Sequence, residues 1–260
     1  MKNGFWIFVV SGAALGGSWC GFVLAPALQL GGAKQATVLG STDAYPLQRT
    51  GDATLGLQVY RANGCAACHT EQVRQTGVTC EVVLTGAGST PAAVTNLIAA
   101  LKLTGLARED ADKIVERITA AGGKAEIHQA AAGPDIARGW GMRRSVAEDY
   151  LYDLPVLLGG LRAGPDLSNI GVRDPDANWQ LTHLYAPAAV VKGSAMPPFR
   201  YLFELRRIGD APSPDALRFP PDFVLPAHYE VVPKPEAKQL AAYLLSLRAN
   251  VPLYDAPVSP

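Results

Sequence analysis

The chain has 260 residues, enough for one large domain or for two small domains with an added segment. Its 23 basic and 23 acidic side chains cancel, and the charged share of 18% is low, which excludes a strongly basic nucleic-acid binder and an acidic disordered tail. The 26 glycines and 20 prolines predict a fold rich in turns and loops.

The N-terminal segment predicts a membrane anchor. A mostly apolar stretch without charged side chains runs from Phe5 to Leu30. A helix of this length crosses the ~30 Å hydrocarbon core of a bilayer. Glycines four residues apart, such as Gly12 and Gly16, would let a helix of a larger membrane protein approach closely. Small residues around Pro26 leave a cleaved signal peptide as an alternative.

A C-x-x-C-H motif occupies residues 65–69, with Cys65, Cys68 and His69 at its fixed positions. This spacing allows two thioethers to one haem while the histidine ligates the iron. The remaining cysteines, Cys20 and Cys80, do not form the second ligand pair of a zinc site. We therefore expect one covalently attached haem c. Bacteria attach such a haem outside the cytoplasmic membrane, so we expect the N-terminus inside and the haem domain on the periplasmic side.

Two amphipathic helices are expected to flank the haem site. Gly56 and Tyr60 precede the motif at helical spacing, and a helix from Glu236 to Arg248 carries Tyr243 on its apolar face. In class I cytochromes c the first and last helices cross, and a glycine allows an aromatic side chain of the partner helix to come close. The pattern predicts such a crossing here.

The sixth ligand of the iron is expected to be Met196. A thioether raises the reduction potential of a haem and suits electron transfer. Two prolines follow Met196 and stiffen its loop, whereas Met142 lies in a basic, flexible stretch. Met142, His183 and His228 stay open as alternatives.

Three further residues are candidates for contacts around the haem. The Pro165 carbonyl could accept a hydrogen bond from His69, because a ligating histidine almost always donates its other N–H to an oxygen. Arg162 could neutralise a haem propionate. Trp179 could wall the haem or donate its N–H to it.

An inserted module of type β-α-α-β is predicted between the motif and the Met196 region. This pattern faintly resembles the C-terminal domain of the ribosomal stalk protein, in Val82-Val83-Leu84, Thr104-Gly105-Leu106 and residues 120–127. The resemblance suggests a fold and no function. Docking of another subunit and an inert insertion both remain open. The expected elements are a strand at Cys80–Leu84, a helix from Pro91 capped by Thr90 and stopped by Gly105, a helix at Arg108–Ala121 and a strand at Lys124–His128.

The stretch from Arg206 to Pro235 contains seven prolines without a periodic pattern. We expect it to run over the surface as an irregular loop.

Several of these motifs together resemble the mono-haem subunit II of cbb3-type haem-copper cytochrome c oxidases. The resemblance implies that Cys65 and Cys68 hold the haem and that His69 and Met196 are its axial ligands. It also implies partners: a many-span catalytic subunit, and other cytochrome c subunits or a soluble donor. The motifs are Tyr45-Pro46-Leu47, the segment 64–69, Gly164-Pro165-Asp166-Leu167, Trp179 with His183, and Met196-Pro197.

The expected fold is mainly α: a transmembrane helix plus a class I cytochrome c-like haem domain, interrupted by a small α/β insertion. The expected domains are the anchor 1–33, the haem domain 34–75 with 135–260, and the module 76–134. The expected function is relay of single electrons in a terminal oxidase of the bacterial cytoplasmic membrane, without an active site of its own. Alternatives are the cytochrome c subunit of a nitric-oxide reductase, and a haem sensor or peroxidase with an open iron site.

Overall fold

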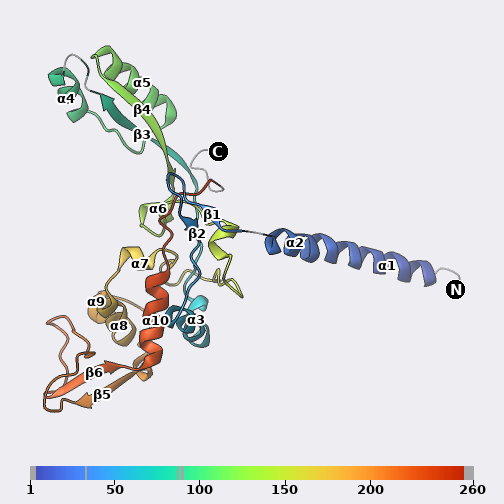
Figure 1. The fold of residues 1–260 in the computed structure, drawn as a ribbon, viewed down its shortest axis with the longest axis vertical. Coiled ribbons are helices and arrows are strands. Elements are labelled where there is room, and N and C mark those ends of the chain that lie inside the picture. The colour runs from blue at the N-terminus through green and yellow to red at the C-terminus, as the bar shows by residue number, and fades with distance from the viewer. Residues whose placement is uncertain (1–3, 33, 87, 89–90, 255–260) are drawn as a thin grey trace.

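Helices predominate in the computed structural model, which describes residues 4–32, 34–86, 88 and 91–254 (Figure 1). The coarse prediction of a mainly helical chain with an apolar N-terminal helix is confirmed. The α-helices are α1 Gly4–Trp19, α2 Ala25–Gly31, α3 Asp52–Ala62, α4 Pro91–Ala99, α5 Arg108–Ala120, α6 Pro134–Ala137, α7 Ile170–Arg173, α8 Ala177–Tyr185, α9 Pro187–Val190 and α10 Pro235–Ser246. Antiparallel strands pair as β1 Ala36–Thr37 with β2 Ala44–Tyr45, β3 Gly77–Gly86 with β4 Lys124–Ala132, and β5 Phe203–Arg207 with β6 Tyr229–Pro233.

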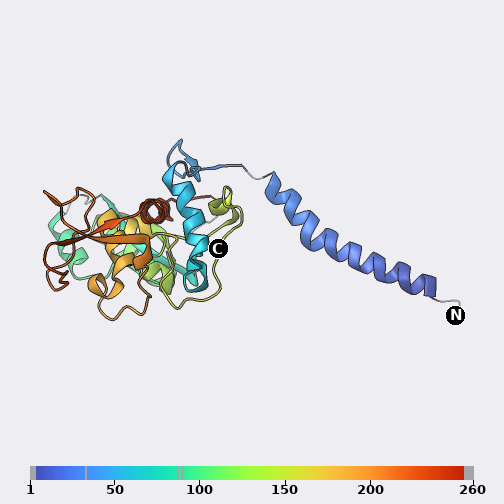
Figure 2. The same cartoon turned by 90° about the horizontal axis from the view of Figure 1, so that it is seen from below.

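The N-terminal helix stands away from the rest of the chain (Figure 2). A π-helical turn at Cys20–Leu24 joins α1 to α2, so the apolar segment Gly4–Gln29 is one helix of 26 residues with none of its most apolar stretch buried. Every backbone group of a helix can be satisfied internally, which is what a bilayer requires. This helix is long and apolar enough to anchor the chain in a membrane.

Helices α3 and α10, which the sequence predicts to flank the haem site, cross at Gly56 as expected. A Cβ atom on Gly56 would overlap the Gln239 carbonyl and lie 2.8 Å from the Tyr243 Cβ. Tyr60 and Tyr243 are each 1% exposed, and their ring centroids lie 5.2 Å apart. The absence of a side chain at Gly56 therefore permits the backbones of α3 and α10 to meet, and the two tyrosines pack at the crossing.

One hydrophobic cluster forms the core of the body that contains α3 and α10. Helices α7 and α8 and the sheet of β5 and β6 contribute to it, so residues from both halves of the sequence meet there. Its most buried apolar side chains include Tyr60, Leu184, Val231, Ala237, Leu240 and Tyr243.

A second, separate cluster lies in the segment that β3, β4, α4 and α5 form, at the end of Figure 1 away from the body. The β-α-α-β element order agrees with expectation, and Cys80 is buried among apolar side chains. Helix α4 ends at Ala99, earlier than expected, because the chain then extends beside β3, where Leu106 pairs with Cys80. Thr90, the expected cap, lies outside the described residues. The domain boundaries stay a prediction.

The expectation of an irregular loop from Arg206 to Pro235 is wrong at both ends. Strand β6 pairs with β5 in the register Phe203 with Pro233 and Arg207 with Tyr229. Val231 is fully buried in the core, which explains the strand, since burial and pairing with a distant segment outweigh the local abundance of proline. The segment between the strands contains no helix or strand.

We predict that Gly56→Ala destabilises the protein. The added methyl group would collide with the backbone of α10, and overpacking of this kind costs about 1 to 3 kcal/mol. Denaturant unfolding measures the change. The matched control is Gly209→Ala, where an added Cβ meets no atom within 4 Å. Equal stability of the two variants would contradict the crossing.

We predict that Glu230→Gln destabilises the β5–β6 hairpin at neutral pH and much less in acid. The Glu230 carboxylate accepts hydrogen bonds from Ser213 N at 2.7 Å and Arg206 Nε at 2.9 Å, which hold the pKa of Glu230 below its usual value. The resulting stabilisation is present above the unfolded-state pKa of about 4.3 and is lost as the pH falls through the lower folded value.

Thermal unfolding of the wild type and the variant at about pH 7 and about pH 3 measures this effect. The exposed Glu204 of β5 supplies the control variant, Glu204→Gln. A stability difference that stays constant between the two pH values would refute the role of the ionised carboxylate.

Candidate functional site

The attachment motif forms a tight turn after α3. Gly64 has a φ of 67°, a left-handed conformation that glycine adopts without strain, and a 3₁₀ turn follows at Cys65–Ala67. His69 N donates to Cys65 O at 3.0 Å. Cys65 is half-buried and Cys68 is exposed, and both are free thiols. Burial raises the pKa of the Cys65 thiol to about 11.

A second segment, residues 158–167, runs alongside the motif and holds it in place. Residues 68–76 and 158–167 lie outside any helix or strand, so hydrogen bonds between the two segments hold them together. The backbone donors and acceptors are Gly160 N to Ala66 O at 3.3 Å, Gly164 N to Cys68 O at 2.9 Å, Leu167 N to Thr70 O at 2.8 Å and Glu71 N to Leu158 O at 3.1 Å.

The His69 imidazole is fixed from one side. Its Nδ1 lies 2.8 Å from the Pro165 carbonyl oxygen, at hydrogen-bond distance, which leaves Nε2 to face a ligand. Gly164 lies directly against the ring, since a Cβ there would come within 2.7 Å of Nδ1. Burial lowers the pKa of His69, and the bond to Pro165 opposes that shift. The neutral imidazole that results is the form that binds metal ions.

A buried carboxylate next to Pro165 anchors this arrangement. Asp166 is fully buried, and its Oδ2 accepts hydrogen bonds from Thr70 Oγ1 at 2.6 Å and Gln72 N at 2.8 Å. Sequence reasoning did not single out Asp166. Its position in a Gly-Pro-Asp turn was the available signal, because aspartates at such turns accept bonds from nearby backbone amides.

Arg162, a candidate partner of a haem propionate, has several partners within the protein. Its Nη1 donates to Asp135 at 2.7 Å, its Nη2 to the Gln72 carbonyl at 2.5 Å and its Nε to Thr70 at 3.0 Å. The guanidinium also lies over the Trp140 ring, 5.3 Å from its centroid. Arg162 therefore clamps the segment after His69 to the start of α6.

Met196 and Trp179 pack against the same hydrophobic cluster as Cys65, and all three are partly buried. The Met196 loop is attached to α8, because Phe199 N donates to Leu184 O at 2.8 Å. The structure thus brings the attachment motif, Trp179 and Met196 to one core, although more than a hundred residues separate Cys65 from Met196.

The alternative ligands differ in their surroundings. Met142 is 44% exposed and does not pack on that cluster, and His228 is exposed in a left-handed conformation with a φ of 65°. His183 is half-buried on α8, with its ring stacked on Trp179.

A buried polar network surrounds Glu71, two residues after His69, and was not expected from the sequence. The Glu71 carboxylate is 4% exposed and accepts hydrogen bonds from the Tyr243 hydroxyl at 2.9 and 3.0 Å. Tyr150 donates to the Glu71 carbonyl at 2.7 Å, and Arg49 pairs with Asp153 nearby. Glu71, Arg49, Tyr150 and Asp153 border a cavity of about 540 Å³. The hydrogen bond from Tyr243 ties the segment after His69 to α10 as well as to residues 158–167.

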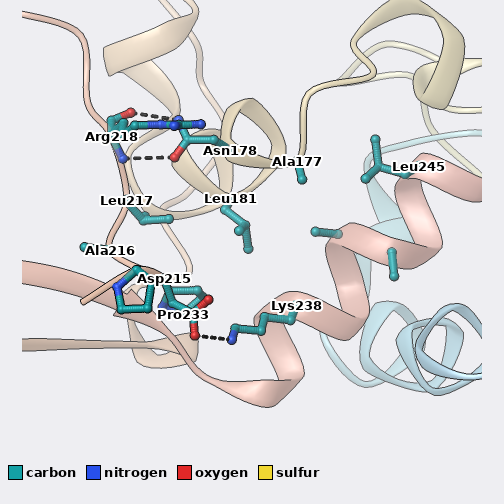
Figure 3. A pocket seen from close by; sticks show the side chains of 13 residues that line it. Ala177, Asn178, Leu181, Asp215, Ala216, Leu217, Arg218, Pro233, Lys238 and Leu245 are labelled. Atoms are coloured by element: carbon teal, nitrogen blue, oxygen red, sulfur yellow. Dashed lines mark hydrogen bonds and ion pairs between the residues drawn. The ribbon is translucent and has the colours of Figure 1, made fainter.

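A second cavity, of about 390 Å³, lies between α8, α10 and the segment at 214–218 (Figure 3). Lys238 pairs with Asp215 at 2.7 Å at its edge, and Asn178 exchanges two hydrogen bonds with the backbone of Arg218. None of the site residues expected from the sequence lines it.

The residues at the motif fit a covalently bound haem. Two free thiols adjoin a histidine whose Nδ1 is engaged and whose ring lies against a glycine. A thioether side chain and an indole share the adjacent apolar core. Among the described residues, no group of three or more His, Cys, Asp or Glu side chains could hold a metal ion, whereas a haem iron needs only two axial ligands.

Crossing terminal helices and a C-x-x-C-H motif are features of c-type cytochromes. Residues 133–212 match the family described as cytochrome c oxidase, mono-heme subunit/FixO. Over this region the chain is similar to the mono-haem subunit of cytochrome c oxidases, and the family predicted from its motifs is confirmed there. No curated protein matches the chain. The matched region contains Pro165, Trp179 and Met196 but not the attachment motif.

We predict that Gly164→Ala removes most of the low-spin haem signal from the purified protein. The methyl group would overlap the His69 ring and force it away from Pro165. Absorption spectra, normalised to protein, measure the loss. Gly160→Ala is the matched control in the same segment, because its added Cβ meets no atom within 4 Å. Equal low-spin content in both variants would refute the assigned position of His69.

Proposed function

We propose that the chain relays single electrons through one covalently attached haem c to the catalytic subunit of the oxidase. The family match supports a cytochrome c oxidase, and not a nitric-oxide reductase, as the complex to which the chain belongs. A bound haem c supplies the one-electron couple between ferric and ferrous iron. The observation that carries the proposal is the contact between His69 Nδ1 and the Pro165 carbonyl, which leaves the other ring nitrogen free for iron.

The proposed roles follow from the surroundings of each side chain. Cys65 and Cys68 bind the haem through thioethers, and His69 and Met196 are its axial ligands. The Pro165 carbonyl orients His69 and increases its basicity. Trp179, partly buried on the same core as Met196, walls the haem and excludes water.

Arg162 has a different proposed role from the propionate partner that the sequence suggested. Its bonds to Asp135, Thr70 and Gln72 support a positioning role, in which it keeps the segment after His69 against Pro165. Because the guanidinium is bound to a carboxylate, its charge is already balanced inside the protein.

The anchor and the chemistry of haem attachment support an orientation. We propose that the N-terminus faces the cytoplasm, that α1 and α2 span the membrane once, and that the haem domain lies in the periplasm. Electrons would then arrive from another cytochrome c subunit or a soluble donor. They would leave to the many-span catalytic subunit, with which the anchor makes permanent contact.

We predict that a tag on this chain co-purifies a many-span haem-copper polypeptide in mild detergent. The haem-loaded chain, separated from the other subunits, should show a low-spin c-type spectrum with the weak long-wavelength band of thioether ligation. Met196→Leu should abolish that band, and Met142→Leu, at an exposed position, should keep it.

Two outcomes would contradict the proposal. Recovery of the tagged chain as a free monomer would count against the assignment to an oxidase complex. A high-spin wild type that binds carbon monoxide readily would indicate an open iron site, as in a sensor or peroxidase.

A further inference from the structure

His183 carries a ring nitrogen for which the protein provides no partner. The Nδ1 atom is buried and has no hydrogen-bond partner among the described residues. The ring is half-buried and lies parallel to that of Trp179, with centroids 4.9 Å apart and an interplanar angle of 3°. A buried polar atom of this kind usually has a partner, so a group outside the polypeptide is the expected one.

His183 lies on α8, the helix to which the loop of the proposed ligand Met196 is attached. The next residue, Leu184, accepts the hydrogen bond from Phe199 that attaches the Met196 loop to α8. Burial, and secondly the charge of His69, lower the pKa of His183 to about 4. His183 is one residue from the attachment point of the Met196 loop, and its stacking partner Trp179 packs on the core that Cys65 and Met196 share.

The two other histidines, His128 and His228, lie in different surroundings. His128 is 58% exposed on β4, in the separate β-α-α-β segment, and its Nε2 lies 3.8 Å from Glu126. His228 is exposed next to β6. Within the described part of the chain, His183 therefore differs from His128 and His228. It has a buried ring nitrogen without a partner, and it stacks on Trp179, which packs on the same core as Cys65 of the attachment motif.

We propose that His183 is a reserve ligand of the haem iron, which occupies the sixth coordination position when the Met196 thioether is lost. This inference rests on the haem site proposed above. In the exchange the iron–sulfur bond breaks, an iron–nitrogen bond forms, and the oxidation state of the iron does not change. A neutral imidazole binds without releasing a proton to the solvent. Because thioether ligation raises the potential, the exchanged state should have a lower reduction potential than the wild type.

The test compares four haem-loaded, full-length proteins in detergent: wild type, Met196→Leu, Met196→Leu/His183→Gln and Met196→Leu/His228→Gln. Absorption and electron paramagnetic resonance spectra report spin state and ligand type. We expect Met196→Leu to lose the thioether band, remain low-spin with two nitrogen ligands and have a lower potential. Adding His183→Gln should make the iron high-spin, and adding His228→Gln should not.

Free imidazole provides the check on folding. If the double variant with His183→Gln has an intact site, added imidazole should restore a low-spin spectrum, and covalent haem per chain should equal that of Met196→Leu. High-spin iron in Met196→Leu itself would overturn the inference. Low-spin iron that persists in the His183→Gln double variant would overturn it as well, since another side chain would then be the ligand.

Failure of the inference differs from failure of the proposed function. A wild type without covalent haem, or without the thioether band, contradicts the proposed function. If the wild type has covalent haem and the thioether band but Met196→Leu is high-spin, the proposed electron relay still stands. Only the proposed role of His183 is then refuted.

Discussion

The hydrogen bond between His69 Nδ1 and the Pro165 carbonyl is the contact on which the proposed haem site depends. It joins residues 96 positions apart in the sequence, in two segments that have no extended secondary structure of their own. Backbone hydrogen bonds between the segments, and the buried Asp166 carboxylate beneath them, keep the carbonyl in place. A fixed imidazole limits rearrangement when the iron changes charge, which is the requirement for transferring electrons without other chemistry.

The sequence predicts those features that depend on local spacing. The C-x-x-C-H motif, the helices around Gly56 and Tyr243, and the β-α-α-β segment are all visible as short patterns. It does not predict features that need a distant partner. Strand β6 forms because it pairs with β5 across a long proline-rich connection, and Arg162 finds Asp135 only once the chain has folded back. Glu71 illustrates the same limit, because its partner Tyr243 lies 172 residues away.

The anchor and the separate β-α-α-β segment place different constraints on the haem domain. A helix that is confined to the membrane raises the effective concentration of the domain near any partner in the same membrane, so a weak contact at the haem edge can suffice for transfer. The β-α-α-β segment has a hydrophobic core of its own, connected to the body through the ends of β3 and β4.

The mass of the intact chain, purified from a host that attaches c-type haems, tests the central claim most directly. Electrospray mass spectrometry under denaturing conditions removes any haem that is not covalently bound. The account predicts a polypeptide heavier than its amino acids by one haem, and loss of that increment when Cys65 and Cys68 are both replaced by serine. A chain that weighs only as much as its amino acids would contradict the account.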